Sequence, residues 1–162
     1  MRVLGIDPGL SGAMAAVSTA TPNILYVEDI PTVSLAHGKG SRKHINTWAM
    51  RKWIIEYGPF DLAMIEQVSA HPGQGVTSMF RFGYAAGFCL GVVTGLGIRT
   101  KLIVPRAWKR EMKVGREKDQ ARQIATDLYP AYSDTFKRKK DVDRAEATLI
   151  ALYGLRTNGA PS

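Results

Sequence analysis

Two carboxylates in the first half of the chain stand where apolar runs end. Asp7 closes "RVLGID" and precedes Pro8-Gly9, and Glu66 interrupts "FDLAMIEQV" near its end. An ionised carboxylate at the end of a buried strand is costly unless it is paired or bound to a metal. Asp before Pro-Gly is also ordinary turn chemistry, and a strand end that has already reached solvent explains Glu66 equally well. The local sequence is therefore compatible with either a structural or a chemical role for both acids.

A second pair of acids lies near the C-terminus, in "DVDRAEATLIALYGL". Asp143 and Glu146 are three residues apart, so on a helix they share one face. Their structural alternative is a place in the first turn, where carboxylates favour the helix dipole. Apolar positions begin immediately at Ala145, so the acidic face borders the buried one. Asp141 would face away on a regular helix and is the reserve for Glu146.

Four converging carboxylates would repel one another unless cations lay between them. Oxygen-only ligands suit the hard ions Mg²⁺ or Mn²⁺ and not zinc, which prefers Cys and His. Two such ions roughly 3.5–4 Å apart would clamp the attacking and leaving oxygens of a phosphoryl displacement. The sequence thus predicts a catalytic, metal-binding site with two Mg²⁺ ions, replaceable by Mn²⁺, on Asp7, Glu66, Asp143 and Glu146.

The net charge of +8 is concentrated in one part of the 162 residues. Residues 99–140 hold 13 Lys and Arg against 5 Asp and Glu, and the remainder holds 9 of each. A one-sided basic surface attracts polyanions, so nucleic acid is the expected partner. A basic solvated face that only aids solubility is the alternative.

The elements that would position the acids follow from the apolar pattern. "RVLGID", "GAMAAV" and "NILYVEDIP" predict a three-stranded antiparallel meander. "FDLAMIEQV" and "IRTKLIV" predict two further strands, and helices are expected over 45–57, in "PRAWKREM", in "EKDQARQIATDLY" and over the last acidic segment. "AHGKGSRKH" is expected to be a loop, and "AYSDTFKRKK" a polar, mobile segment.

A long apolar stretch from Val76 to Gly97 carries glycines four residues apart. On a helix they form one stripe, which permits close approach to a sheet or another helix, and the same helix of a second copy is the expected partner. A membrane span is disfavoured, because the 17 uncharged residues are fewer than the roughly 20 that spanning needs. The stripe consists of Gly83, Gly87, Gly91 and Gly95.

The order of elements predicts an α/β fold: a mixed five-stranded sheet, its first three strands antiparallel, with helices on both faces. One domain over residues 1–158 and a short tail at 159–162 are expected. Neither a GxxxxGK[ST] loop nor a GxGxxG motif after a strand occurs, which excludes P-loop nucleotidases and Rossmann dehydrogenases. The single Cys89 is expected to be a buried thiol, and a cytoplasmic location, in a bacterial cell or a phage-infected host, is the default.

Four motifs in order carry a family resemblance. "GIDPGLSGAMAAV", "MIEQV" with the glycine-striped helix behind it, "VPRAWK" and "DVDRAEATLIA" resemble the RuvC-type Holliday junction resolvases (crossover junction endodeoxyribonucleases), including phage or prophage versions, over residues 2–155. The resemblance implies an RNase H-like fold. It also implies a homodimeric, Mg²⁺-dependent endonuclease of DNA recombination and repair that binds four-way DNA junctions, nicks two opposing strands symmetrically and leaves ends that can be religated.

The resemblance also maps functional residues onto this chain. The family's acids correspond to Asp7, Glu66, Asp143 and Glu146, the last being Asp in most members. Ser69 stands where the family commonly has a stacking aromatic. Trp108 is expected to anchor its short helix in the core, and stacking is the alternative. The DNA-binding face corresponds to Arg106, Lys109, Lys113, Arg116 and Lys118, which would contact phosphates. The loop "GKGSRKH" and the run "KRKK" at 137–140 could touch outlying duplex arms, and a solvated tail is the alternative for the latter.

Two other classes of protein fit the same motifs. A YqgF-type RNase H-like nuclease acting on structured RNA shares the opening strand and Asp-x-Gly. A branched-DNA-binding protein without catalysis would share the basic flank, although four retained carboxylates argue against it. The actin-like ATPases need two such domains, for which 162 residues are too few.

Overall fold

The computed structural model describes residues 1–38, 40–69, 73–117 and 119–159. Its main sheet has the order β3-β2-β1-β6-β7, in which the pairs β1–β2 and β2–β3 are antiparallel and β6 is parallel to both β1 and β7. The expected mixed five-stranded sheet with an antiparallel meander is therefore confirmed. Its strands are β1 (Arg2–Asp7), β2 (Ala13–Ser18), β3 (Tyr26–Asp29), β6 (Leu62–Glu66) and β7 (Thr100–Ile103).

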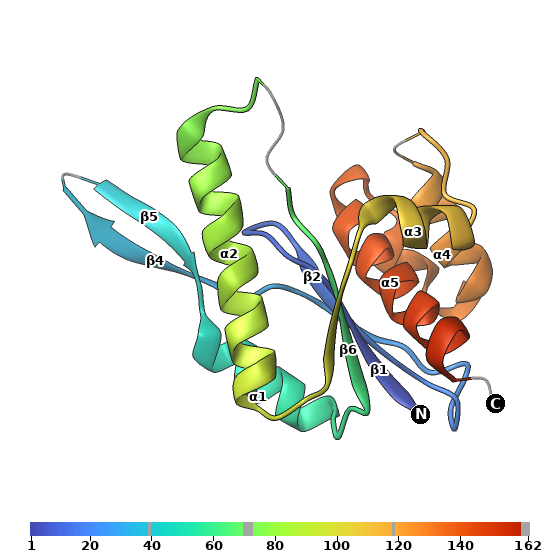
Figure 1. Cartoon of the computed structure of the whole chain (residues 1–162). Coiled ribbons are helices and arrows are strands. Elements are labelled where there is room, and N and C mark those ends of the chain that lie inside the picture. Colours follow the sequence, from blue (N-terminus) through green and yellow to red (C-terminus); the bar gives the residue numbers. More distant parts are fainter. Residues whose placement is uncertain (39, 70–72, 118, 160–162) are drawn as a thin grey trace.

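Helices cover both faces of this sheet, as expected (Figure 1). One face packs against α1 (Thr47–Tyr57) and α2 (Val76–Gly95). The other packs against α3 (Pro105–Glu111), α4 (Gln120–Leu128) and α5 (Val142–Asn158). The positions of the strand acids on these faces follow from the alternation of side chains along each strand.

In β1 the alternation assigns Asp7 to the α5 side. Leu4 and Ile6 belong to the core beneath α2, whereas Val3 belongs to the core beneath α5. Asp7 has the same parity as Val3, so it emerges beside α5. Gly5 lies between them, and a Cβ there would collide with the Ala147 carbonyl and with Ala151. The missing side chain lets α5 approach β1 closely, which brings the first turn of α5 to the end of the strand.

Replacing Gly5 by Val is therefore expected to destabilise the fold more than most core substitutions. The new side chain has α5 backbone in its way, and overpacking a tight core costs about 1–3 kcal/mol or more. A thermal melt would show a Tm lowered by several degrees. The control is Gly40→Ala, whose added Cβ meets its nearest neighbour at 4.0 Å; equal melting of the two variants would contradict this packing.

The segment expected to be a loop forms a second, two-stranded sheet. β4 (Thr32–His37) and β5 (Gly40–Ile45) pair as an antiparallel ribbon that projects from the main sheet beside α2 (Figure 1). The loop prediction was wrong because most of the ribbon is exposed, so no alternating buried face marks it in the sequence. The next helix begins at Thr47, where the Asn46 side chain accepts a hydrogen bond from the Ala49 amide at 3.1 Å.

The segment expected to be polar and mobile is ordered into two short 3₁₀ helices. They are η1 (Pro130–Phe136) and η2 (Lys139–Asp141). Phe136 is 1% exposed in the core beneath α5. Arg122 donates hydrogen bonds to the carbonyls of Phe136 at 3.2 Å and Lys137 at 2.9 Å. One buried ring and one arginine therefore hold a stretch whose composition is that of a loop.

α2 is apolar yet largely exposed. Only Ala85, Cys89 and Val93 are buried, while glycines 83, 87, 91 and 95 face open space. Burial raises the pKa of the Cys89 thiol to about 12, in agreement with the expected inert thiol. Within the described residues α2 is also the one helix whose length and composition would let it cross a bilayer, and one such helix is weak evidence for a span. An exposed apolar face of this kind commonly marks an interaction site.

Candidate metal centre and nucleic-acid interface

Three of the four predicted acids come together at the ends of β1 and β6 and on α5. One carboxylate oxygen each from Asp7, Glu66 and Glu146 lies within 4.8 Å of the others. Leu62 and Met64 of β6 share the core beneath α5, so the alternation directs Glu66 to the same side as Asp7. In the parallel pairing Ile6 lies opposite Ile65, which places the two acids beside each other one residue further on.

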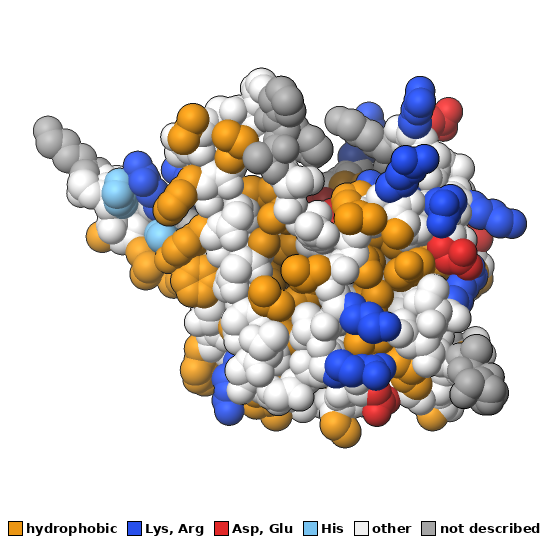
Figure 2. Space-filling view, viewed as in Figure 1, with side chains coloured by type: hydrophobic (Ala, Val, Ile, Leu, Met, Phe, Trp, Pro, Cys, Tyr) orange, Lys and Arg blue, Asp and Glu red, His pale blue; other side chains and the backbone are white. Residues whose placement is uncertain are grey.

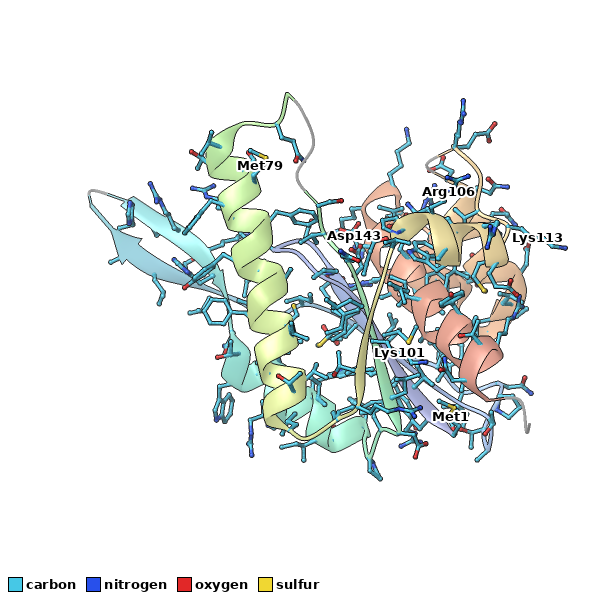
Figure 3. The ribbon with its side chains drawn as sticks, viewed as in Figure 1. Met1, Met79, Lys101, Arg106, Lys113 and Asp143 are labelled. Carbon is cyan, nitrogen blue, oxygen red and sulfur yellow. The ribbon has the colours of Figure 1, made fainter. Side chains whose placement is uncertain are left out.

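The fourth acid, Asp143, borders the same hollow. It lines a cavity of about 550 Å³ together with Asp7, Glu66 and Glu146. Figure 3 shows Asp143 between the layer of α3 to α5 and the strand ends. Its carboxylate accepts a hydrogen bond from the Ser11 side chain. All four predicted acids therefore face one hollow.

Burial and mutual repulsion raise the pKa values of three of these acids. Burial raises the pKa of Asp7 well above its usual range, and the charges of Glu66, Glu146 and Asp143 raise it further. Burial also raises the pKa of Glu66 and that of Asp143, against hydrogen bonds from Trp108 and Ser11 that lower them. The cluster is costly to ionise without a cation, and a bound divalent metal would relieve that cost.

This cost predicts how the metal-free protein responds to pH. Because the folded-state pKa of Asp7 lies above its unfolded value, its favourable contribution is complete below the unfolded pKa and is lost as pH rises through the folded pKa. Asp7→Asn cannot ionise, so in EDTA it is expected to raise Tm at pH 7 and to raise it less at pH 5. Melts of both proteins at the two pH values check this.

The control for that experiment is Asp134→Asn, since the Asp134 side chain is 96% exposed. It should leave Tm unchanged at both pH values. Mg²⁺ should stabilise the wild type and not Asp7→Asn, because a ligand that binds only the folded state raises stability. A Tm gain that is the same at pH 5 and pH 7 would contradict the electrostatic origin.

Two side chains of α3 contact the acidic cluster. Trp108 is fully buried, which confirms its expected core position, and its indole Nε1 donates to Glu66 Oε1 at 2.8 Å. The neighbouring Lys109 places Nζ 3.0 Å from Glu146 Oε1 and 5.1 Å from the Trp108 ring centroid. α3 thus fixes one acid by a hydrogen bond and partly neutralises another.

The predicted basic residues do not all reach this site. Lys109 and Arg116 line a second hollow that shares Asp143 and Glu146 with the first. Arg106 is exposed near the start of α3, and Lys113 lies at the outer edge of the helical layer (Figure 3). Lys118 lies outside the described residues.

Asp141, the reserve for Glu146, has other partners. It is 1% exposed and accepts hydrogen bonds from Arg138, at 2.8 Å from both the backbone amide and Nη2. Arg144 Nη1 lies 3.9 Å from the same carboxylate. Glu146 lies in the acidic group and Asp141 does not. Asp141 is a structural residue that anchors the start of α5.

Three residues lie at the site although the sequence analysis did not place them there. Ser11 holds Asp143, Lys43 of the ribbon lines the carboxylate hollow, and Lys139 lines the second hollow. Lys43 and Lys139 stand in segments read as a loop and a mobile segment. Their charge was visible, but nothing in the sequence indicates the folding that brings them to the acids. Ser69, at the position of the family's stacking aromatic, is exposed.

The fold is shared with solved structures of Holliday junction resolvases. The structure of Thermus thermophilus RuvC in complex with a Holliday junction substrate matches 98% of this chain and 97% of that chain, with TM-score 0.61 and 13% identity. A further Thermus thermophilus RuvC structure matches 97% of this chain and 96% of that one, with TM-score 0.57 and 14% identity. The resemblance expected from the sequence is confirmed as one of fold.

Two particular relatives extend this comparison. The yeast mitochondrial Holliday junction resolvase Ydc2 has TM-score 0.53 and 15% identity, over 95% of this chain and 78% of that one. In sequence, the chloroplastic Holliday junction resolvase MOC1 of Chlamydomonas reinhardtii is 30% identical over 86 residues, 52% of this chain. The chain spans about 10% of the length of MOC1. No family model matches the chain.

Proposed function

We propose that this protein is a Mg²⁺-dependent, structure-specific endonuclease that binds four-way DNA junctions as a homodimer. It resolves them by paired symmetric nicks through two-metal hydrolysis of phosphodiester bonds. The observation that carries the proposal is the meeting of Asp7, Glu66 and Glu146 within 4.8 Å. A second hollow adjoins them, and its lining brings Lys109, Arg116 and Lys139 together with Glu117 and Asp119. The fold shared with RuvC and Ydc2 supports the choice of substrate.

The donor set fits a hard divalent cation. Every chemical ligand in the cluster is a carboxylate oxygen, and three of the acids are costly to ionise where they stand. Asp7, Glu66 and Glu146 would hold the metal, and Asp143 would complete the site. Bound Mg²⁺ would stabilise the charge that develops on the phosphate and would help to activate water.

The chain's own residues have defined tasks around that metal site. The Trp108 indole fixes the Glu66 carboxylate, and the Ser11 hydroxyl fixes that of Asp143. Lys109 supplies a cation where the two hollows meet. Phosphate contacts from Lys109, Arg116 and Lys139 would position a DNA strand without reading its sequence. Arg106 and, outside the described residues, Lys118 would extend that contact, and Lys113 would meet a more distant duplex arm.

The homodimer is proposed to form through the glycine face of α2. That face is apolar and is not covered by the described residues of the monomer. A closely packed helix from a second copy would fit against its glycines. A two-fold dimer would present two carboxylate sites to the two symmetric halves of a junction. Action on cellular or phage DNA would place the protein in the cytoplasm.

A bulky residue in this face separates dimerisation from folding. Gly87→Leu and Gly91→Leu add side chains where an added Cβ would meet no atom within 4 Å beyond the nearby backbone of α2, so both variants should fold. They are expected to be monomers at micromolar concentration and to lose the pairing of the two nicks. Sedimentation velocity against a Gly40→Ala control measures this. A wild type that sediments as a monomer would contradict the proposed assembly.

The substrate is tested with a panel of end-labelled synthetic nucleic acids in Mg²⁺. Selective nicking of four-way junctions over linear duplex, with symmetric cuts in opposing strands, is expected. Cleavage of RNA hairpins without cleavage of junctions would favour the YqgF-type alternative. Junction binding without cleavage in Mg²⁺ or Mn²⁺ would favour a binding protein that has lost catalysis.

A further inference from the structure

A further groove of about 630 Å³ lies between the β4–β5 ribbon and the N-terminal half of α2. This volume is typical of sites for small molecules and nucleotides. Its ribbon wall carries Arg42, Lys43 and His44, and its helix wall carries Phe80, Arg81 and Tyr84. The described residues that line it include three permanent cations and no Asp or Glu. We refer to it as the ribbon groove.

The helix wall of the ribbon groove presents exposed aromatic rings. The side chain of Phe80 is 72% exposed and that of Tyr84 46% exposed. Their rings are nearly parallel, with centroids 6.1 Å apart and planes 17° apart, and His44 meets Tyr84 edge-on at 6.3 Å. Figure 2 shows apolar surface over α2 continuing to the ribbon, where basic and histidine side chains gather. Such an exposed, organised aromatic surface indicates a binding site.

Charge complements these rings. Arg42, Lys43 and Arg81 have no ion pair among those found in the described part of the chain. Unpaired cations beside aromatic faces are the combination that binds single-stranded nucleic acid, because phosphates meet the charge and unpaired bases stack. A duplex hides the faces of its bases, so duplex DNA would leave Phe80 and Tyr84 without a partner.

The ribbon groove is continuous with the carboxylate site. Leu10 and Lys43 line both hollows. Phe82, two residues after Phe80, lines the carboxylate hollow and lies close to Gly9. A strand held in the ribbon groove would therefore run directly past Asp7.

We propose that the ribbon groove binds the unpaired nucleotides of the DNA strand being cut, on one side of the scissile phosphate. Bases stack on Phe80 and Tyr84, and phosphates contact Arg42 and Lys43. This assignment rests on the proposed function and adds to it the residues that hold the cut strand beside Asp7. Lys109 and Arg116, which line the second hollow, contact the strand on the other side.

The test uses four-way junctions that carry 2-aminopurine beside the mapped cut, bound to full-length protein in EDTA. Stacking on an aromatic ring quenches this base, so wild type should quench it, and Phe80→Leu and Tyr84→Leu should quench it less. The same variants should cut in Mg²⁺ about tenfold more slowly, the order expected for losing one stacked base. The matched control is Trp48→Leu on α1, 69% exposed and outside both hollows.

The charge is tested with Arg42→Ala against Arg51→Ala, an exposed cation on α1. Only Arg42→Ala should weaken binding and reduce its salt dependence. If the wild type cuts junctions but the groove variants quench and cut as well as their controls, the strand-binding role of the ribbon groove is refuted and the proposed function stands. A wild type that cuts no junction would overturn the proposed function itself.

A second copy covering the same aromatic surface is the competing occupant. Sedimentation velocity of Phe80→Leu, together with its quenching, distinguishes a bound DNA strand from a second copy of the chain. A dimer with weakened quenching supports the strand-binding groove. A monomer with unchanged quenching assigns Phe80 to the protein interface and overturns it.

Discussion

Asp7→Asn is expected to abolish junction cleavage while leaving junction binding intact or stronger. The substitution keeps the shape of a side chain that is 8% exposed but removes its charge from the acidic hollow. A site without that charge holds a divalent cation poorly, so the rate should fall at least about 10³-fold, or ~4 kcal/mol of transition-state stabilisation. Binding should persist because one negative charge is removed from a site for a polyanion.

Single-turnover cleavage and gel-shift binding measure the two effects separately. Asp134→Asn is again the control, since it makes the same change at an exposed position. A rate for Asp7→Asn within a factor of a few of the wild type in Mg²⁺ would refute the site. Loss of binding together with cleavage would indicate a structural role for Asp7, as would a Tm that falls in EDTA.

Glu146→Gln is expected to lose cleavage and keep its stability, whereas Asp141→Asn is expected to lose stability and keep cleavage. Glu146 shares the acidic group with Asp7 and Glu66, so its neutral form should cut about 10²-fold or more slowly with little change in Tm. Asp141 is buried against Arg138 and belongs to no such group. Its neutral form should keep cutting and should melt several degrees lower, because a hydrogen-bonded charged pair is lost.

The pH dependence separates these two acids further. The Arg138 hydrogen bond lowers the pKa of Asp141 below its usual range. The stability that it supplies is present above the unfolded pKa and is lost as pH falls through the folded pKa. The Tm difference between wild type and Asp141→Asn should therefore shrink on acidification. Loss of cleavage by Asp141→Asn with an unchanged Tm would reverse the two assignments.

The sequence predicted the parts of the site that depend on alternation and helix spacing. Asp7 and Glu66 end strands whose apolar residues alternate between two cores, and Asp143 and Glu146 share one face of α5. These patterns are local, so they can be read without knowing the fold. The tight approach at Gly5 then joins the two pairs, and nothing next to Gly5 in the sequence reveals that contact.

What the sequence could not predict depends on surfaces and long-range contacts. The β4–β5 ribbon has almost no buried face, so the alternation that identifies a strand is missing and Lys43 was assigned to a loop. Residues 130–141 are held by the buried ring of Phe136 and by two hydrogen bonds that Arg122 donates to backbone carbonyls. Both are long-range contacts that the local sequence does not indicate. Trp108 was correctly expected in the core, but its bond to Glu66 joins residues 42 positions apart.

Metal-dependent junction resolution is tested most directly by incubating wild-type protein and one four-way junction with Mg²⁺, with EDTA, and with EDTA followed by excess Mg²⁺. Each strand is end-labelled in turn, so that the positions of the nicks can be compared. We expect symmetric nicks in two opposing strands that a ligase can seal, none in EDTA, and recovery when Mg²⁺ is returned. Nicks that persist undiminished in EDTA, or an intact junction in both Mg²⁺ and Mn²⁺, would contradict a metal-dependent resolvase built on Asp7, Glu66 and Glu146.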